Sequence, residues 1–190
     1  LPHGAAVKSV VQGAPAANAK IRAGDIITEF NSVPIDEYTD FIKILDKAIE
    51  EAKDMLIERF EWICSQDPRS AKFMYENGLM AGYDGKDIRS ALKHGTLAVG
   101  QLGLAEALQI LIGCDHTCEE GMKVAKMIEG LFKNRCAEYK EKYHLNFGVY
   151  YTPAENLCHT ALKKFKDKYG IIENVSDKDF FTNSMHVPVW

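Results

Sequence analysis

The chain has 190 residues and a mass of 21.3 kDa, enough for one domain or two incomplete ones, because domains commonly run about 100 to 150 residues. Hydrophobic residues make up 46% and charged residues 26%, a composition that excludes a disordered chain and predicts a packed core. Lys and Arg total 23 against 27 for Asp and Glu, giving a net charge of -4 without a basic block. This balance excludes a protein that wraps nucleic acid.

No apolar run approaches the roughly 18 to 20 residues that span a bilayer, so we expect a soluble protein with no membrane partner. The chain opens at Leu1 with no basic and apolar leader, so we expect a piece of a longer protein without a secretory signal. The cysteines form no even-numbered framework, which favours reduced thiols and a cytoplasmic location; they are Cys64, Cys114, Cys118, Cys136 and Cys158.

The sequence pattern of the N-terminal third changes from strands and turns to a helix at Asp36. Residues 1–35 are rich in Gly, Ala and Pro and alternate in polarity at 6–10 and 25–30, which predicts short strands and turns. From Asp36 the pattern becomes helical until Gln66-Asp67-Pro68. The apolar stripe of this long helix is Phe41, Leu45, Ala48, Ala52, Leu56, Phe60 and Ile63.

The middle of the chain alternates helix and strand signals. After a glycine-containing loop we expect a helix over 85–94, a short strand over 96–99 and a helix over 102–112 that ends at Gly113. Thr117 and Glu120 fit a capping box, which predicts that a long amphipathic helix begins there. Its apolar stripe is Met122, Ala125, Ile128, Phe132, Cys136, Tyr139 and Tyr143.

The C-terminal segment continues the alternation. The pattern predicts a strand over 146–151, a helix over 153–169 closed by Gly170, and a final strand over 180–189. Alternating strands and helices favour an α/β layer or barrel. The fold class expected from the sequence is therefore α/β.

One run near the N-terminus is distinctive, with Gly13-Ala14-Pro15-Ala16-Ala17 followed by Ile21-Arg22-Ala23-Gly24-Asp25-Ile26-Ile27. It closely resembles the middle of a PDZ domain of the kind attached to HtrA-type serine proteases. The resemblance covers residues 1–45, which we expect to form a partial PDZ-like segment. Lys20 departs from the pattern where Gly is common, and Ser32 stands where Asn-Gly would make the turn.

PDZ domains bind a peptide C-terminus as an added strand and capture its carboxylate on backbone amides. Here the chain begins after the carboxylate loop and lacks the closing strands after Leu45, so the resemblance implies an incomplete groove. The alternative function is a non-catalytic peptide-binding module. Its peptide contacts would be Ala6, Val7, Lys8, Ser9 and Val10.

Three longer motifs follow, namely "LKHGTLAVGQLGLAEALQILIGCDHT" at 92–117, "NFGVYYTPAENLC" at 146–158 and "YGIIENVSDKDFFTNSMHVPVW" at 169–190. In this order and spacing they resemble the catalytic subunit of the anaerobic, class III, glycyl-radical ribonucleoside-triphosphate reductase. The resemblance implies that residues 46–190 are a fragment of a ten-stranded α/β barrel. The family reduces ribonucleoside triphosphates to deoxyribonucleotides by radical chemistry.

The resemblance also implies cofactors and partners for the parent enzyme: a glycyl radical, a zinc site, ATP or deoxynucleotide effectors, and formate or a thiol reductant. A radical-SAM activating enzyme would be its partner, and the parent would be a homodimer. In the family the thiyl cysteine lies upstream of the stretch matched here, and the radical glycine and zinc cysteines lie beyond Trp190. We therefore expect no catalytic residue, cofactor or metal ligand within this chain, and an inactive fragment.

A substrate wall is the part of the site that we expect to find. Thr152, Ala154, Glu155 and Asn156 lie where a strand leads into a helix, and the resemblance places this turn at the active-site end of the barrel. First-turn amides at a helix N-terminus suit a phosphate. The same residues also fit a capping box, with Thr152 as the cap and Pro153 at the first helical position, which needs no ligand. Both interpretations remain open at this point.

Other constellations carry weaker signals. Cys114, His116 and Cys118 have possible zinc spacing but make one compact cluster, whereas a structural zinc site needs four ligands. Cys158 and His159 are adjacent on a helix and so do not face each other as a catalytic pair would. Helix-boundary roles explain these residues, and a join between the two resemblances is expected near Ile44 and Leu45.

Overall fold

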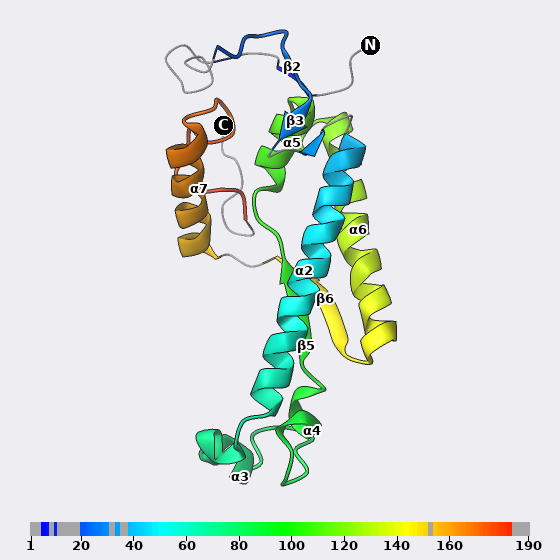
Figure 1. The fold of residues 1–190 in the computed structure, drawn as a ribbon. Helices are drawn as coiled ribbons and strands as arrows, with labels where there is room; N and C mark the ends of the chain where they lie inside the picture. The colour runs from blue at the N-terminus through cyan, green and yellow to red at the C-terminus, as the bar shows by residue number, and fades with distance from the viewer. Residues whose placement is uncertain are drawn as a thin grey trace. The chain divides into compact units, whose positions relative to one another are not determined.

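The computed structural model describes residues 5–7, 10, 20–30, 33–34, 38–151 and 154–183. The chain divides into two compact units, shown as a ribbon in Figure 1. The first unit contains residues 1–45, 100–129 and 151–190, and the second contains 46–99 and 130–150. The chain passes between the units several times, so the proposed division into domains at residue 45 stays a prediction.

Four very short strands occupy the N-terminal segment. β1 (Ala5–Ala6) pairs antiparallel with β2 (Ile26–Ile27), and β3 (Glu29–Phe30) pairs antiparallel with β4 (Val33–Pro34). Between β1 and β2, the Asp25 amide donates to the Arg22 carbonyl over 3.1 Å and Gly24 has a φ of 94°. A positive φ at this turn position favours glycine, in agreement with the Ala-Gly-Asp turn of the sequence.

Lys20 also has a positive φ, of 63°, at the position where the PDZ resemblance expects glycine. A side chain in this left-handed region is strained, whereas glycine is not. Lys20 in place of glycine therefore raises the conformational energy of the backbone at this position, and the chain nevertheless keeps the turn.

The long helix expected after Asp36 is α2 (Tyr38–Cys64), with 27 residues. Its buried face carries Ile49, Lys53 and Phe60, and Ala48 and Ile63 of the expected stripe are exposed. The stripe is therefore shifted by one residue in its middle. The shift follows from Lys53, whose ammonium is buried because carboxylates and tyrosine rings surround it.

Two short helical turns that the sequence did not predict follow α2, namely the 3-10 turn η1 (Pro68–Ala71) and α3 (Lys72–Glu76). Asp67 caps η1 by accepting from the Arg69 amide over 2.8 Å. The helix expected over 85–94 is shorter, because Asp87 accepts from the Arg89 amide over 2.8 Å and so starts α4 (Ile88–Leu92). Aspartate is a preferred N-cap, and it sets the start in both cases.

The expected strands in the second half are β5 (Thr96–Gly100) and β6 (Asn146–Tyr150), which form one two-stranded sheet. The Asn146 side chain donates to the His94 carbonyl over 3.5 Å, and Gly148 faces Thr96. The residues in each contact are 52 positions apart, so both strands advance in the same direction and β5 and β6 run parallel. Parallel strands need a long crossover between them, which here contains two helices.

The crossover holds α5 (Leu104–Ile112) and α6 (Glu119–Tyr143), and α7 (Glu155–Tyr169) follows β6. α5 ends at Gly113 and α7 at Gly170, as expected, both with positive φ. The face of α6 is also confirmed, because most of its stripe is buried; the buried members are Ala125, Ile128, Phe132, Cys136 and Tyr139.

Two expectations for helix starts are wrong. α6 begins at Glu119, one residue later than expected, and the Gly121 amide of its first turn donates to Cys118 Sγ over 3.1 Å, so Cys118 rather than Thr117 occupies the cap position. The Thr117 amide donates to the Asp115 carboxylate over 2.6 Å. α7 begins at Glu155 after Ala154, so the predicted cap with Pro153 at the first helical position is also wrong. At α7 the left-handed conformation of Ala154, with a φ of 42°, delays the start of the helix.

The strand expected over 180–189 is wrong for 180–183, which are irregular; the rest lies outside the described residues. The fold is a helix-rich α/β arrangement with a small parallel sheet. Within the described part of the chain, no helix is both long and apolar enough to cross a membrane. The expectation of reduced thiols is wrong for Cys114 and Cys118, which form a disulfide with their Cα atoms 6.5 Å apart, whereas Cys64, Cys136 and Cys158 carry no disulfide.

Candidate nucleotide site

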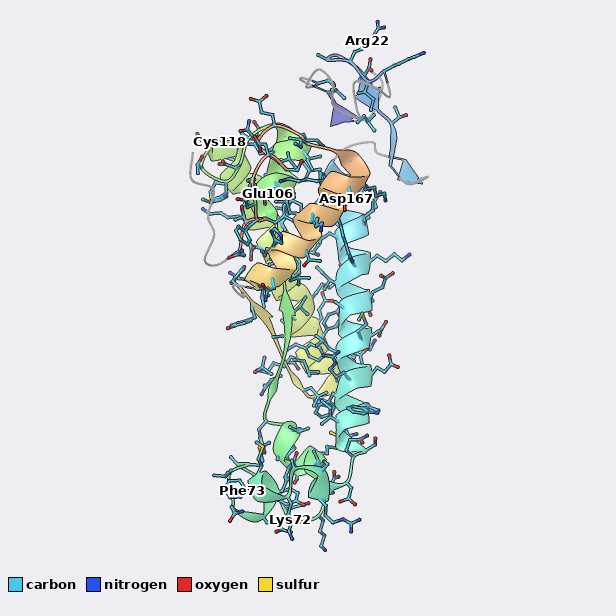
Figure 2. All side chains as sticks on the ribbon, turned by 90° about the vertical axis from the view of Figure 1, so that its left-hand side faces the viewer. Arg22, Lys72, Phe73, Glu106, Cys118 and Asp167 are labelled. Atoms are coloured by element: carbon cyan, nitrogen blue, oxygen red, sulfur yellow. A yellow bond between two sulfur atoms is a disulfide. The ribbon has the colours of Figure 1, made fainter. Side chains whose placement is uncertain are left out.

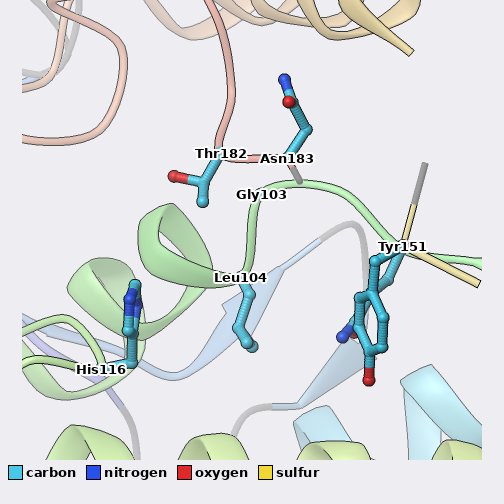
Figure 3. Close-up of a pocket in the computed structure, with 7 residues that line it drawn as sticks. Gly103, Leu104, His116, Tyr151, Thr182 and Asn183 are labelled. Atoms are coloured by element: carbon cyan, nitrogen blue, oxygen red, sulfur yellow. The ribbon is translucent and has the colours of Figure 1, made fainter. Parts of the chain in front are cut away.

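The first unit contains a cavity of about 230 Å³ close to the end of β5. Figure 3 shows Thr182 and Asn183 beside Gly103, with His116 and Tyr151 contributing further side chains. The lining is Gln101, Gly103, Leu104, His116, Tyr151, Thr182 and Asn183. Most of this surface is apolar, with a few polar groups, as is common for small-molecule sites.

The strand ends place these residues. Gln101 and Gly103 follow β5 directly, and Tyr151 follows β6, so the carboxyl ends of both strands contribute to the cavity. Ligands in parallel α/β folds commonly bind at this edge of the sheet. Gly103 has a φ of 75° and starts α5, so the chain can turn sharply from the strand into the helix.

Glu106 anchors the irregular C-terminal segment beside the cavity. This residue is only 2% exposed and is labelled in Figure 2. Its carboxylate accepts hydrogen bonds from Lys178 Nζ over 2.7 Å, from the Thr182 amide over 3.1 Å and from the Thr182 hydroxyl over 2.8 Å. The Gly103 amide in turn donates to the Thr182 carbonyl over 2.8 Å. These bonds satisfy a buried charge and fix one wall of the cavity.

Three further hydrogen bonds hold the remaining walls. Glu129 accepts hydrogen bonds from both Gln101 Nε2 and the Tyr151 hydroxyl, so one carboxylate joins the segments that follow the two strands. The Asn183 amide group donates to Cys158 Sγ over 3.2 Å, and Cys158 is fully buried in α7. The cavity is therefore bounded by polar contacts between segments distant in sequence.

His116 supplies a ring to the cavity lining from the turn that precedes α6. Its Nδ1 is buried and has no hydrogen-bond partner among the described residues. The neighbouring Asp115 is buried as well; burial acts to raise the pKa of its carboxyl, but hydrogen bonds from Thr117 hold that pKa below its ordinary value.

The predicted phosphate residues lie at the start of α7, and the structure describes only part of them. Thr152 lies outside the described residues, as does the side chain of Glu155. Ala154 has a left-handed φ of 42° and precedes the helix, and Asn156 is exposed in its first turn. The first-turn amides therefore belong to Glu155, Asn156 and Leu157.

The residues expected to contact a peptide are only partly described, because Lys8 and Ser9 lie outside the described residues. Ala6 pairs with Ile26 in the β1–β2 ladder. The Val7 amide donates to the Asp25 carbonyl over 2.8 Å, and its carbonyl accepts from the Gly24 amide over 2.7 Å. Val10 is half-buried.

The weaker candidates gain no support from the geometry. The Cys158 thiol accepts from Asn183, whereas His159 Nδ1 lies 3.1 Å from the Asp179 carbonyl, so the two do not form a pair. Among the described residues, no group of three or more His, Cys, Asp or Glu side chains is arranged to hold a metal ion.

Sequence reasoning missed the cavity residues Thr182 and Asn183 and the supporting Glu106, and it considered His116 only as a possible zinc ligand. Glu106 did give a signal, since a carboxylate inside the apolar run "LAEALQILI" requires a buried partner. Nothing in the local sequence identifies that partner, because Lys178 and Thr182 lie more than seventy residues away.

These features define a class of protein: a helix-rich α/β protein with a cavity at the ends of two parallel strands. The family model for anaerobic ribonucleoside-triphosphate reductase matches residues 31–190, and the PDZ domain model matches residues 2–53. Because the first match covers most of the chain, the chain belongs to the anaerobic ribonucleoside-triphosphate reductase family.

Named relatives agree with this assignment. The anaerobic ribonucleoside-triphosphate reductase of Escherichia coli is 30% identical over 161 residues, which is 81% of this chain and 22% of the relative. The enzymes of Salmonella typhimurium and Enterobacteria phage T4 are 29% and 28% identical, covering 80% and 78% of this chain and 22% and 24% of their own lengths. The chain thus spans less than a quarter of the curated relatives it matches.

Proposed function

We propose that this chain supplies part of the nucleotide-binding wall of an anaerobic ribonucleoside-triphosphate reductase, within the ten-stranded α/β barrel expected from the family resemblance. The observation that carries the proposal is the cavity at the carboxyl ends of β5 and β6 in a chain that belongs to this family. The base or ribose of the nucleotide would occupy the cavity. The triphosphate would lie at the start of α7.

The start of α7 suits an anion for two reasons. The helix has 15 residues, so its dipole places partial positive charge at the first turn. Ala154, the residue before the helix, has only a methyl side chain and cannot accept from the first-turn amides, which therefore keep donor capacity for phosphate oxygens. The contributing residues are Thr152, Ala154, Glu155 and Asn156, although the charge of Glu155 opposes a phosphate.

Nucleotide binding by the full chain tests this proposal, with ATP and adenosine as probes in amide-detected NMR. ATP should shift the amides of Glu155, Asn156 and Leu157, and both probes should shift Gln101 and Leu104. Asn156→Asp should weaken ATP binding several-fold, because it adds a negative charge beside the phosphates. Asn134→Asp makes the same change on an exposed face of α6 and should leave binding unchanged. Saturating ATP without any shift at 155–157 would exclude the phosphate site.

By itself the chain should not reduce nucleotides, because the resemblance places the thiyl cysteine and the radical glycine outside it. Purified chain is incubated anaerobically with a radical-SAM activating enzyme, formate and a ribonucleoside triphosphate. We expect no deoxynucleotide and no glycyl-radical signal in electron paramagnetic resonance. A doublet from a glycyl radical would contradict this part of the proposal.

The remaining assignments also follow from the family. We propose a cytoplasmic location, a homodimeric parent enzyme and an activating enzyme as partner, with no nucleic-acid or membrane partner. Zinc, the glycyl radical, the nucleotide effectors and the electron donor would be properties of the parent enzyme.

The second candidate function is recognition of a peptide C-terminus, which the PDZ match over residues 2–53 favours. β1 has one edge paired with β2, so its other edge would accept the peptide. Titration with C-terminal peptides should then shift the amides of Ala6, Val7 and Val10 at micromolar concentration. Unshifted amides at millimolar peptide would exclude this candidate.

A further inference from the structure

The turn that leads into α6 is closed by several bonds. Cys114 and Cys118 are joined by a disulfide and are separated by four positions in the sequence. Within this small ring, the Asp115 carboxylate accepts from the Thr117 amide over 2.6 Å, and the Asp115 carbonyl accepts from the Cys118 amide over 3.4 Å. The bridged turn, residues 114–118, therefore has little freedom while the disulfide is intact.

Its contact with α6 leaves no spare room. A methyl group on Gly121 would lie 1.8 Å from the Asp115 carbonyl oxygen, so the backbone of the bridged turn lies directly against the first turn of the helix. The Gly121 amide also donates to Cys118 Sγ over 3.1 Å. A change in the bonding of this sulfur is thus felt both in the turn and at the start of α6.

The bridged turn also carries His116, which lies two residues from each cysteine and lines the cavity. Its Nδ1 is buried and unpaired among the described residues. An unpaired buried nitrogen costs free energy that a rotation toward the cavity, or toward water, would relieve. The closed ring opposes that rotation because it fixes the backbone on both sides of His116.

We propose that Cys114 and Cys118 form a reversible redox pair that sets the position of His116 on the cavity wall. With the disulfide intact, Nδ1 stays buried. After reduction the ring opens, the turn relaxes, and the imidazole presents a nitrogen to the cavity. A single bridge in a chain whose other three cysteines carry no disulfide is typical of a redox-responsive pair rather than of a structural disulfide framework.

The chemistry is ordinary thiol–disulfide exchange. A thiolate of an external dithiol attacks one sulfur of the bridge, giving a mixed disulfide and releasing the other cysteine, which takes up a proton. The second thiol of the reductant then displaces the first cysteine, so the protein gains two thiols and the reductant becomes a cyclic disulfide. Glutathione disulfide reverses the process and leaves as two glutathione thiols.

Thiol counting on the full chain tests the redox pair. The protein is equilibrated with dithiothreitol or with glutathione disulfide, unfolded, alkylated with iodoacetamide and weighed. All five cysteines should be alkylated after reduction, and only Cys64, Cys136 and Cys158 after oxidation. Peptide mapping should place the bridge at 114–118. Five alkylated cysteines after oxidation, or a bridge to another cysteine, would overturn the proposal.

The position of His116 is read from its ring C–H signals in NMR, which His116→Gln identifies. These signals should differ between the oxidised and reduced protein, and Cys114→Ser should hold them at the reduced position under both conditions. Cys64→Ser, at a cysteine of the second unit that carries no disulfide, should leave the response intact. Identical His116 signals in oxidised and reduced wild-type protein, a comparison that needs no variant, would show that the bridge does not control the ring.

Discussion

Glu106 in the first unit and Lys53 in the second are both almost completely buried, but their partners differ in kind. The partners of Glu106 are Lys178 and Thr182, from an irregular segment more than seventy residues later in the chain. Lys53 bonds to Glu50 at 2.7 Å and Asp54 at 2.5 Å on its own helix, and its ammonium lies 5.6 Å and 5.4 Å from the ring centres of Tyr139 and Tyr143.

The two sites differ in the environment of the partner groups that remain when the buried charged residue is removed. The side chains of Glu50 and Asp54 are 42% and 67% exposed, so water solvates them if Lys53 is removed. Removal of Glu106 instead takes away an almost fully buried carboxylate that accepts from both the amide and the hydroxyl of Thr182 beside the cavity. The first unit should therefore be the more sensitive to loss of its buried charge.

Glu106→Ala should have the largest effect, a loss of about 3 kcal/mol in the free energy of unfolding, because it removes a buried, charged acceptor of hydrogen bonds from the part-buried Lys178 and Thr182. Urea unfolding measures the loss, and hydrogen exchange should show weaker protection of the Thr182 amide. Glu106→Gln keeps an acceptor for Thr182 and should lose less. A loss below about 1 kcal/mol for the alanine variant would show that the network contributes little.

Alanine substitutions at two glycines of α6, one in each unit, allow the two units to be compared within a single helix. Gly121→Ala should destabilise by about 2 to 3 kcal/mol, because the new methyl meets the Asp115 carbonyl and forces the turn to move. Gly130, which lies in the second unit, has open space around it, so Gly130→Ala should stabilise by about 0.5 to 1 kcal/mol. Thermal or urea unfolding of both variants measures the two changes in the free energy of unfolding. Equal changes at the two sites would contradict the close contact at Gly121.

Lys53→Met should change the free energy of unfolding by less than about 1 kcal/mol, because the methionine packs against the two tyrosines and the carboxylates return to water. Urea unfolding at pH 7 provides the measurement. A loss of about 3 kcal/mol, equal to that of Glu106→Ala, would remove the proposed distinction between the two units.

The smallest effect is a pH dependence in the second unit. A hydrogen bond from Arg135 holds the pKa of Asp46 below its ordinary value, and bonds from Lys53 and Tyr139 do the same for the pKa of Glu50. Because both folded pKa values lie below the unfolded ones, this stabilisation is complete above about pH 5 and is lost as the pH falls through the folded values.

The urea midpoint should thus fall between about pH 5 and pH 3, and Asp46→Asn should make the fall less steep. Each partly exposed pair should contribute at most about 1 kcal/mol. Asn134→Asp, on an exposed position of α6, provides the control. An unchanged slope in Asp46→Asn would assign the acid sensitivity to other carboxyls.

Part of the candidate site was predictable. The strand ends at Gly100 and Tyr150 and the helix after the Thr152 turn follow from local patterns, and the resemblance of three motifs points to one family. The start of α7 was placed two residues too early, because Ala154 adopts a left-handed conformation that its residue type does not signal.

The sequence by itself determined the long helices, the positions of the two strands of the β5–β6 sheet, the helix-ending glycines and the family, because periodic burial and turn chemistry act over a few residues. Only the tertiary structure decided that Glu106 meets Lys178 and Thr182, that Lys53 rather than Ala48 is buried, and that Cys114 bonds Cys118 beside the cavity. The contacts of Glu106 and Lys53 depend on which distant segments pack together, and local pattern carries no information about the partner of a buried charge. The bridge joins residues only four positions apart, but their spacing alone does not fix the turn that brings the two sulfurs together.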